Sequence, residues 1–183
     1  VIDEKDTTED HLRDTLIAGD GLCNVEAVRE CVSKGKEAID WLSDIGTSFT
    51  RDKSSNNYHL TQEGGHSKRR VVHSEDATGK EVSSSLAEIV RSISNIKVLE
   101  NHICVDLVTA KGRCVGAYVL DINTNEVKTF SSGSTIIATG GASKIYLYTS
   151  NPDGSSGDGI GLAWRAGCKV ENLEFNQFHP TCL

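Results

Sequence analysis

Apolar residues recur at helical spacing in three stretches of the first half of the chain. These stretches cover residues 9–19, 24–46 and 78–93, and in each of them apolar side chains return every three or four positions. Asn24 is a favoured N-cap residue, and Thr78-Gly-Lys-Glu81 has the pattern of a capping box, in which the Thr hydroxyl and the Glu carboxylate satisfy each other's free amides. The sequence therefore predicts three amphipathic helices.

The second half of the chain changes to short stretches rich in β-branched residues. Lys111-Gly-Arg113 and Asn123-Thr-Asn125 supply turn residues between these stretches. This alternation predicts a β-meander. The predicted strands are residues 96–99, 103–108, 115–121 and 126–130.

A further apolar run and a glycine-flanked acid follow the meander. Residues 134–138 predict a buried strand that runs into Thr139-Gly-Gly141, and Ser156-Gly-Asp-Gly159 predicts the start of a helix. Helices and strands in this order predict a mixed α/β (α+β) fold. Three apolar residues of the last helix are expected to face inward: Ile160, Ala163 and Trp164.

Charge and composition narrow the class of protein. The 183 residues carry a formal net charge of −7, which argues against a nucleic-acid binder, since phosphate contacts need clustered Lys and Arg. The basic cluster Lys68-Arg-Arg70 is either a solvated edge, the interpretation favoured for Lys68, or a local attractor of anions beside a Gly-Gly turn. No apolar run approaches the ~20 residues of a membrane helix, so no membrane association is expected.

The Cys and His residues are not spaced as metal ligands. The six Cys include no Cys-x-x-Cys pair, and the six His have no zinc-like spacing with them. We therefore expect reduced, half-buried cysteines, no bound metal and a cytoplasmic location.

Two glycine-containing segments could approach a ligand closely. Ala138-Thr-Gly-Gly141 leaves the backbone bare at the end of a strand, where a flat ring or a pyrophosphate can come near the main chain. The alternative is an ordinary strand-to-loop turn. Asp158 either caps its helix, which is favoured when the residue is taken alone, or hydrogen-bonds a cofactor at the helix N-terminus.

Two further segments place a polar group among glycine or apolar neighbours, as a small anionic substrate requires. Glu63-Gly-Gly-His-Ser67 joins an acid and an imidazole across two glycines, and a flexible glycine-rich turn is the alternative. Leu173-Glu-Phe-Asn-Gln-Phe-His-Pro-Thr181 places His179 among aromatic residues, where a buried structural histidine is the alternative.

The order and spacing of these segments resemble the flavoprotein family of succinate dehydrogenase, fumarate reductase and L-aspartate oxidase. The resemblance covers the whole chain, and the Gly-Asp-Gly and Phe-His-Pro-Thr blocks together are highly specific to that family. Three stretches are similar to the L-aspartate oxidase branch in particular: Asp14-Thr-Leu-Ile-Ala-Gly19, Tyr58-His-Leu-Thr-Gln-Glu-Gly-Gly-His-Ser67 and Tyr146-Leu-Tyr-Thr-Ser-Asn-Pro152.

This resemblance implies an FAD enzyme that oxidises L-aspartate to iminoaspartate, the first step of NAD biosynthesis. The α-hydrogen would leave as hydride to a non-covalently bound flavin, which oxygen or fumarate would reoxidise. Glu63 would face the substrate ammonium, because a carboxylate selects for that group and repels a second carboxylate. The implied partners are L-aspartate, fumarate or another dicarboxylate, and the quinolinate synthase step downstream.

The resemblance also assigns residues to the substrate and to the cofactor. The substrate group is Glu63, which would orient the amine, His66, which would line the flavin–substrate cavity, Gln177, and His179, which would hold a carboxylate. The FAD group is Gly65, Ser67, Ile103, Cys104, Ala138, Thr139, Gly140, Gly141 and Asp158.

The same resemblance implies that the chain is an internal piece of a larger enzyme. Residues 1–173 would form part of a Rossmann-like FAD-binding domain, and residues 174–183 would begin the capping domain that closes over the substrate. The dinucleotide fingerprint and the catalytic arginine of the family would lie outside the piece. We therefore expect the isolated chain to be inactive, to bind FAD weakly or not at all, and to be able to self-associate through unpaired strand edges.

Two other functions are alternatives. The first is a fumarate reductase or succinate dehydrogenase flavoprotein subunit, and Glu63 argues against it because succinate and fumarate carry no amine. The second is a non-catalytic scaffold that binds a protein or a small anion. The polar residues Glu63, His66, Asp158 and His179 argue against that scaffold.

Overall fold

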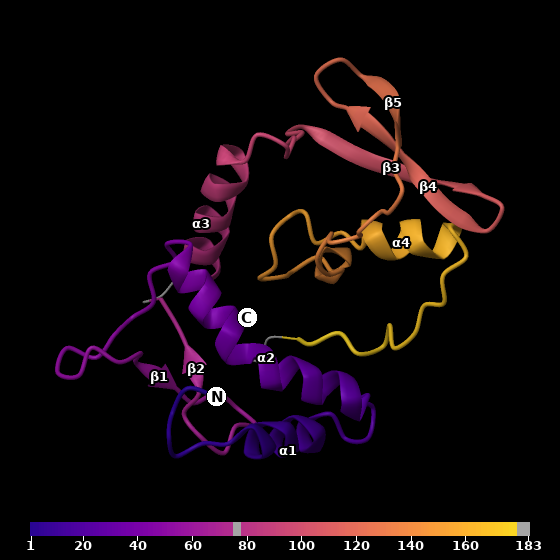
Figure 1. The fold of residues 1–183 in the computed structure, drawn as a ribbon. Coiled ribbons are helices and arrows are strands. Elements are labelled where there is room, and N and C mark those ends of the chain that lie inside the picture. Colours follow the sequence, from indigo (N-terminus) through magenta and orange to yellow (C-terminus); the bar gives the residue numbers. More distant parts are fainter. Residues whose placement is uncertain (75–77, 179–183) are drawn as a thin grey trace. The chain divides into compact units, whose positions relative to one another are not determined.

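Residues 1–74 and 78–178 are described by the computed structural model, and the chain divides into two compact units, Val1–Val98 and Leu99–Leu183. Among the described residues, the first unit holds helices α1, α2 and α3 with a short hairpin, and the second holds a three-stranded sheet and helix α4 (Figure 1). The mixed helix and sheet content confirms the predicted fold class. The predicted domain boundary after residue 173 stays a prediction.

Two capped helices open the first unit. The helices α1 (Thr8–Ala18) and α2 (Val25–Asp44) contact each other and bury Leu12. Thr7 and Asn24 act as N-caps, each accepting a hydrogen bond on its side-chain oxygen from an amide three residues further on. Both helices, and the role of Asn24, agree with the sequence prediction.

A short antiparallel hairpin follows in the same unit. Its strands are β1 (Leu60–Thr61) and β2 (Val71–Val72), with Leu60 opposite Val72. The connecting loop, residues 62–70, contains the Glu63–Ser67 segment. The hairpin therefore presents this segment at its end.

Helix α3 (Thr78–Ser92) starts where the capping box was predicted, but the partners differ. The Glu81 carboxylate accepts a hydrogen bond from the amide of Ser48, at 3.0 Å, and the Thr78 hydroxyl accepts one from the amide of Ser74, also at 3.0 Å. The capping-box prediction is wrong on this point, because Glu81 bonds Ser48, which is distant in the sequence, and Thr78 bonds Ser74, which lies four positions before it.

The β-meander of the second unit is confirmed. Strands β3 (His102–Ala110), β4 (Arg113–Asp121) and β5 (Glu126–Ser131) pair antiparallel in sequence order. Lys111 and Gly112 form the two-residue turn between β3 and β4, with φ angles of 52° and 73°. Two positive φ angles are those of a type I′ turn, whose twist matches that of the flanking strands.

Asp121 closes the other turn of the meander. Its carboxylate accepts hydrogen bonds from the Lys128 ammonium and the Asn123 amide, each at 3.0 Å. These contacts, the Lys128 hydrogen bond first, lower the pKa of Asp121 from 3.8 to about 2. A charged carboxylate therefore fastens the end of β4 to β5.

Two predicted strands do not form in this chain. Residues 96–99 follow a turn in which the amide of Ile96 donates to the carbonyl of Ile93, at 3.1 Å. Residues 134–138 pair as a strand with none of the described residues, and the side chain of Ile136 is 89% exposed. A strand needs a neighbour for its backbone hydrogen bonds, and the described residues place none beside this segment.

The last helix of the described chain is α4 (Asp158–Arg165), which contacts β3. Leu162 is buried, whereas Trp164 is 67% exposed, so the prediction that Trp164 faces inward is wrong. Successive helical residues turn by about 100°, which places Leu162 and Trp164 on opposite sides of the helix.

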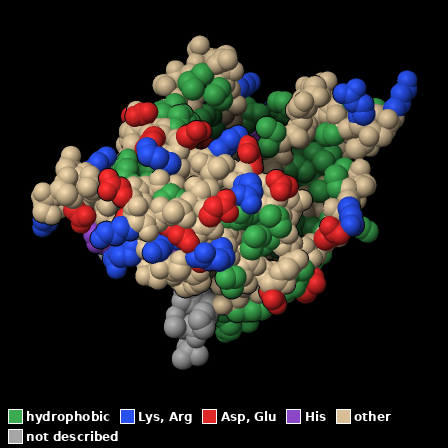
Figure 2. All heavy atoms as spheres, turned by 60° about the horizontal axis from the view of Figure 1, so that its bottom comes forward, with side chains coloured by type: hydrophobic (Ala, Val, Ile, Leu, Met, Phe, Trp, Pro, Cys, Tyr) green, Lys and Arg blue, Asp and Glu red, His purple; other side chains and the backbone are tan. Residues whose placement is uncertain are grey.

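Acidic and basic side chains are interspersed with apolar patches on the face shown in Figure 2. Within the described residues, no helix has the length and apolar character needed to cross a bilayer.

Candidate functional site

The Glu63–Ser67 segment forms a tight turn at the end of the β1–β2 hairpin. The amide of His66 donates to the carbonyl of Glu63, at 3.1 Å, and Gly65 has a φ of 81°. A glycine adopts this left-handed conformation without steric cost. The turn therefore gathers the predicted residues Glu63, Gly65, His66 and Ser67 within the first unit, and it leaves Glu63 exposed.

A buried ion-pair network of Asp6, Asp14 and Arg70 contacts this turn at Ser67. Asp14 Oδ2 accepts hydrogen bonds from the amide and the hydroxyl of Ser67, at 2.8 and 2.7 Å, and from Arg70 Nη1, at 2.8 Å. Arg70 also donates Nε and Nη2 to the two carboxylate oxygens of Asp6, both at 2.8 Å. These contacts join helix α1 to the hairpin loop.

Arg70 corrects the interpretation of the basic cluster. The sequence left Lys68-Arg-Arg70 open between a solvated edge and an attractor of external anions, yet the Arg70 side chain is only 3% exposed and pairs with carboxylates of its own unit. No spacing rule links Arg70 to Asp6 and Asp14, which lie 64 and 56 positions away. From the sequence alone, the acids in and just before the first helix could have been named only as candidate partners of Arg70.

His66 has a polar atom that the described structure leaves without a partner. Its Nδ1 is buried and makes no hydrogen bond to a described residue. The ring of His11 lies 5.7 Å away, centroid to centroid. Burial, followed by the nearby charge of Arg70, holds the pKa of His11 below 6.5. A buried polar atom without a partner destabilises a folded protein. The His66 Nδ1 is therefore a candidate for a hydrogen bond with a ligand.

In the second unit, the predicted cofactor segment lies against the start of α4. Ala138, Thr139 and Gly140 line a hollow of about 450 Å³ together with Gly159. The amide of Gly157 donates to the carbonyl of Gly141, at 3.1 Å. The structure thus brings residues 138–141 next to Asp158, the first residue of the helix.

Asp158 does not cap its helix, although capping was the interpretation favoured for the residue alone. Gly157 is the N-cap, with a φ of 80°, and no side chain closes the helix start. Asp158 is exposed in the first helical turn. Its carboxylate is therefore available for a hydrogen bond with a cofactor, which is the second interpretation that the sequence left open.

Ile103 and Cys104 lie near the beginning of β3, the strand that α4 contacts. The guanidinium of Arg165 at the end of α4 donates to the carbonyl of Val105, at 3.1 Å, and to Asp106 Oδ1, at 3.2 Å. This contact fixes β3 against the helix that carries Asp158.

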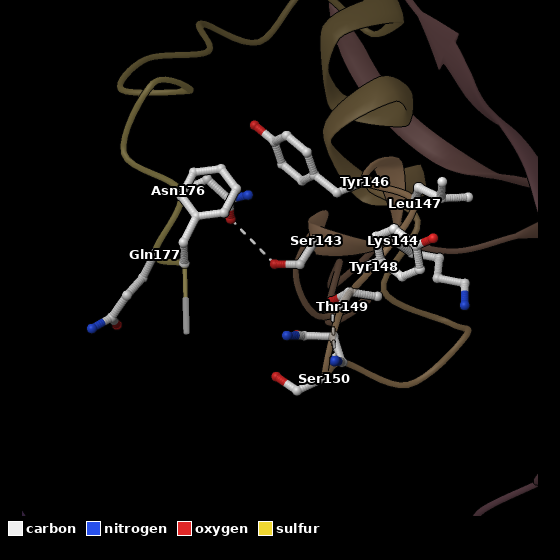
Figure 3. A pocket seen from close by; sticks show the side chains of 11 residues that line it. Ser143, Lys144, Tyr146, Leu147, Tyr148, Thr149, Ser150, Asn176 and Gln177 are labelled. Atoms are coloured by element: carbon white, nitrogen blue, oxygen red, sulfur yellow. Dashed lines mark hydrogen bonds between the residues drawn. The ribbon is translucent and has the colours of Figure 1, made fainter. Parts of the chain in front are cut away.

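Gln177 lines a separate hollow of about 650 Å³ in the second unit (Figure 3). The rings of Tyr146 and Phe178 meet edge to face, with centroids 5.0 Å apart. The Ser143 hydroxyl hydrogen-bonds Asn176 Oδ1, at 3.2 Å, whereas the Gln177 side chain points away from Ser143. No local sequence signal marks this pocket, because its two walls lie about thirty positions apart in the chain.

His179, predicted to hold a substrate carboxylate, lies outside the described residues. Its placement stays a prediction, as does its assembly with Glu63.

Gly159 makes the close contact between α4 and the cofactor segment possible. A Cβ at this position would lie 2.0 Å from Thr139 Oγ1 and 2.7 Å from Ile137 Cγ2. We expect Gly159→Ala to destabilise the second unit by about 1–3 kcal/mol, as overpacking does. Gly161→Ala is the control in the same helix: its nearest neighbour is the flexible end of Arg165, so the variant should gain up to about 1 kcal/mol of helix propensity. Urea unfolding of both variants measures the two changes, and the same sign for both would contradict the packing argument.

Comparison with known proteins identifies the family. The sequence matches the family described as "FAD binding domain" over residues 2–183. The chain belongs to this family. The cofactor of the family, FAD, is therefore the cofactor indicated for this chain.

Curated relatives with one shared name match the whole chain. It is 53% identical over 195 residues to the L-aspartate oxidase of Pseudomonas aeruginosa and 51% identical over 193 residues to that of Vibrio cholerae. Each alignment covers 100% of this chain and 36% of the relative. The chloroplastic L-aspartate oxidase of Arabidopsis thaliana is 44% identical, over 97% of this chain and 28% of its own length. The chain thus spans about a third of the length of these relatives.

Solved structures show the same fold. Mycobacterium smegmatis Sdh1 in complex with UQ1 matches with a TM-score of 0.85 and 26% identity, over 90% of this chain and 29% of that chain. A quinol-fumarate reductase with menaquinol molecules matches with a TM-score of 0.87 and 24% identity, over 91% of this chain and 29% of that chain. The expected resemblance to succinate dehydrogenase and fumarate reductase flavoproteins is confirmed at the level of the fold.

Proposed function

We propose that this chain serves in an L-aspartate oxidase, which oxidises L-aspartate to iminoaspartate with FAD as the electron acceptor. The observation that carries the proposal is the 41–53% identity, over all or nearly all of the chain, to bacterial proteins named L-aspartate oxidase. Oxygen or fumarate would be the final acceptor.

The second unit fits part of an FAD site. Gly140 has a φ of 74° and open space where a Cβ would lie, so a ligand can approach the main chain there. At the start of α4, no side chain caps the backbone amides beside the Asp158 carboxylate. In our proposal, the backbone of Ala138–Gly140 and the side chain of Asp158 hold part of FAD, with Ile103 and Cys104 flanking it. Bound FAD would supply a two-electron acceptor for the hydride that leaves the substrate Cα.

In the proposed mechanism, the Glu63–Ser67 turn recognises the amine of the substrate. Glu63 stands exposed at the end of the hairpin, where its carboxylate can pair with the ammonium of L-aspartate. His66 would donate or accept one hydrogen bond inside the substrate cavity, and Gln177 and His179 would hold a carboxylate. Oxidation removes the hydrogen of Cα as hydride and two protons from the ammonium nitrogen, which pass to solvent, so that a carbon–nitrogen double bond forms.

Glu63→Gln tests this assignment. The variant is made in the whole enzyme, which contains residues 1–183 at the position where the relatives contain the matching segment. We expect kcat/KM for L-aspartate to fall by about 10- to 100-fold, since a charge-assisted contact contributes about 1.5–3 kcal/mol. The reduction of fumarate, which carries no amine, should fall by less than about threefold because it loses no such contact. Steady-state rates with both substrates measure the ratio.

The control for this test is Glu37→Gln, which neutralises an exposed acid of α2 and should change neither rate. Equal losses for L-aspartate and fumarate would remove Glu63 from amine recognition. An unmodified whole enzyme that reduces fumarate but does not oxidise L-aspartate would favour the alternative, a fumarate reductase or succinate dehydrogenase flavoprotein.

A further inference from the structure

We propose that Asp14 is a positioning residue for the Glu63–Ser67 turn and thereby sets how strongly the enzyme prefers dicarboxylates that carry an amine. The inference rests on the proposed function, because it assigns a consequence to the placement of Glu63. The stretch Asp14–Gly19 is similar to the L-aspartate oxidase branch, but neither the sequence motifs nor the resemblance assigned a role to Asp14.

Asp14 meets the turn with one carboxylate oxygen that accepts every contact. Its Oδ2 accepts the Ser67 amide, the Ser67 hydroxyl and Arg70 Nη1, all within 2.8 Å. The side chain is 9% exposed. The two hydrogen bonds from Ser67, followed by the Arg70 contact, lower the pKa of Asp14 from 3.8 to about 2. The residue is therefore a buried, permanently charged acceptor at neutral pH.

The other end of the network makes Asp14 rigid. Arg70 donates two hydrogen bonds to the carboxylate of Asp6, whose side chain is 1% exposed. Asp14 lies within α1 and Asp6 lies just before Thr7, the N-cap of that helix, and the guanidinium plane fixes the distance between this part of the chain and the loop.

The turn has few other restraints of its own. Gly64 and Gly65 carry no side chain to pack, and a Cβ on Gly65 would meet only Ala18, at 3.8 Å. Inside the loop, the Gln62 side chain donates to the carbonyl of His66, at 2.6 Å. Within the described ranges, the only hydrogen bonds that join residues 63–67 to a residue outside the hairpin are the two that Ser67 donates to Asp14.

The consequence concerns Glu63, which lies four positions before Ser67, whereas the His66 ring keeps its own contact with His11. When Ser67 loses its anchor, the backbone that carries Glu63 can shift, and a displacement of about 1 Å in a binding group can cost up to about 100-fold in rate. A dicarboxylate without an amine makes no contact that depends on Glu63, so its turnover should be far less sensitive.

The test compares Asp14→Asn with the unmodified whole enzyme. An amide keeps the shape of the carboxylate but removes its charge, so the hydrogen bonds from Arg70 and Ser67 lose the charge that strengthens them. We expect KM for L-aspartate to rise about tenfold and KM for fumarate to rise less than about twofold, with an unchanged FAD content. In a Glu63→Gln background, Asp14→Asn should add less than about twofold, because residues that act through one contact are not additive.

Asp10→Asn is the matched control, since Asp10 lies on the same helix with an exposed partner, Arg13, and should change neither KM. Ser67→Ala is the second variant, because it removes one donor and leaves the Asp14–Arg70 pair intact. It should shift the preference for L-aspartate over fumarate in the same direction as Asp14→Asn, by a smaller factor.

Equal changes for both substrates, or full additivity with Glu63→Gln, would overturn the positioning role and leave Asp14 as a residue of general stability. If Asp14→Asn lowers the melting temperature or the FAD content, the decision passes to Ser67→Ala, and an unchanged substrate preference there would overturn the proposal. Failure of the proposed function itself would show earlier, as absent L-aspartate oxidation in the unmodified enzyme.

Discussion

Replacing Arg70 with methionine is expected to destabilise the first unit by about 3–5 kcal/mol, the cost of removing one partner from a buried ion pair. The side chains of Arg70 and Asp6 are 3% and 1% exposed, so solvent cannot replace the lost guanidinium. Two carboxylates, Asp6 and Asp14, would remain buried together without their cation. Urea unfolding, with hydrogen–deuterium exchange read over residues 1–98, measures the loss where it should occur.

Arg29→Met is the matched control for this prediction. Arg29 also forms an ion pair with an acid of α1, Glu9, but both side chains are about half exposed or more, and such surface pairs contribute about 0–1 kcal/mol. Asp6→Asn added to Arg70→Met should recover part of the stability, because it removes one of the stranded charges. A loss of under about 1 kcal/mol for Arg70→Met would mean that water reaches the network and that the pair does not hold α1 to the loop.

Replacing Gly116 with alanine is expected to destabilise the second unit by about 3 kcal/mol or more, at the high end of single substitutions. A Cβ on Gly116 would lie 1.9 Å from the carbonyl oxygen of Phe130 and 2.9 Å from its carbon, which are backbone atoms of the neighbouring strand. Gly116 also has a φ of 155°, and it pairs with Val108 on one side and Ser131 on the other. The central strand can accept the methyl group only if β5 moves away.

Hydrogen–deuterium exchange identifies this effect by its location. Faster exchange should be confined to the β4–β5 ladder, while the amides of residues 1–98 keep their protection. Gly133→Ala is the control, since a Cβ there meets no atom within 4 Å, and surface changes of this kind usually stay within about 0.5 kcal/mol. Unchanged protection of β5 in Gly116→Ala would show that the ladder tolerates the methyl group.

Local signals carried most of the secondary structure. Asn24 can be predicted as an N-cap from its residue type, because a capping side chain bonds an amide only three residues away. Lys111–Gly112 can be predicted as a turn because it lies between two adjacent strands. The strand predicted at 134–138 failed because pairing is not local: the apolar pattern is present, but the described residues supply no neighbour. The prediction that Trp164 faces inward was wrong because a helix of only eight residues has too few apolar positions to show which face is buried.

The candidate site also combines residues that local sequence signals can predict with residues that they cannot. Glycine spacing pointed to the 63–67 turn and to the Gly157–Gly159 helix start, because backbone freedom is written in the sequence itself. Asp14 and Arg70 could not be found by spacing, since 56 positions separate them and only the folded chain brings them together. The Tyr146–Phe178 pocket was missed for the same reason.

The short turns of the meander have a consequence for the order of folding. Strands β3, β4 and β5 are joined by two-residue and four-residue loops, so every pairing in this sheet is between neighbours in sequence. Closing such small loops costs little entropy, and hairpins form within microseconds. During synthesis, this sheet can therefore assemble as soon as residue 131 has left the ribosome. The Ala138–Gly141 segment then emerges next to an already folded surface, against which α4 can dock.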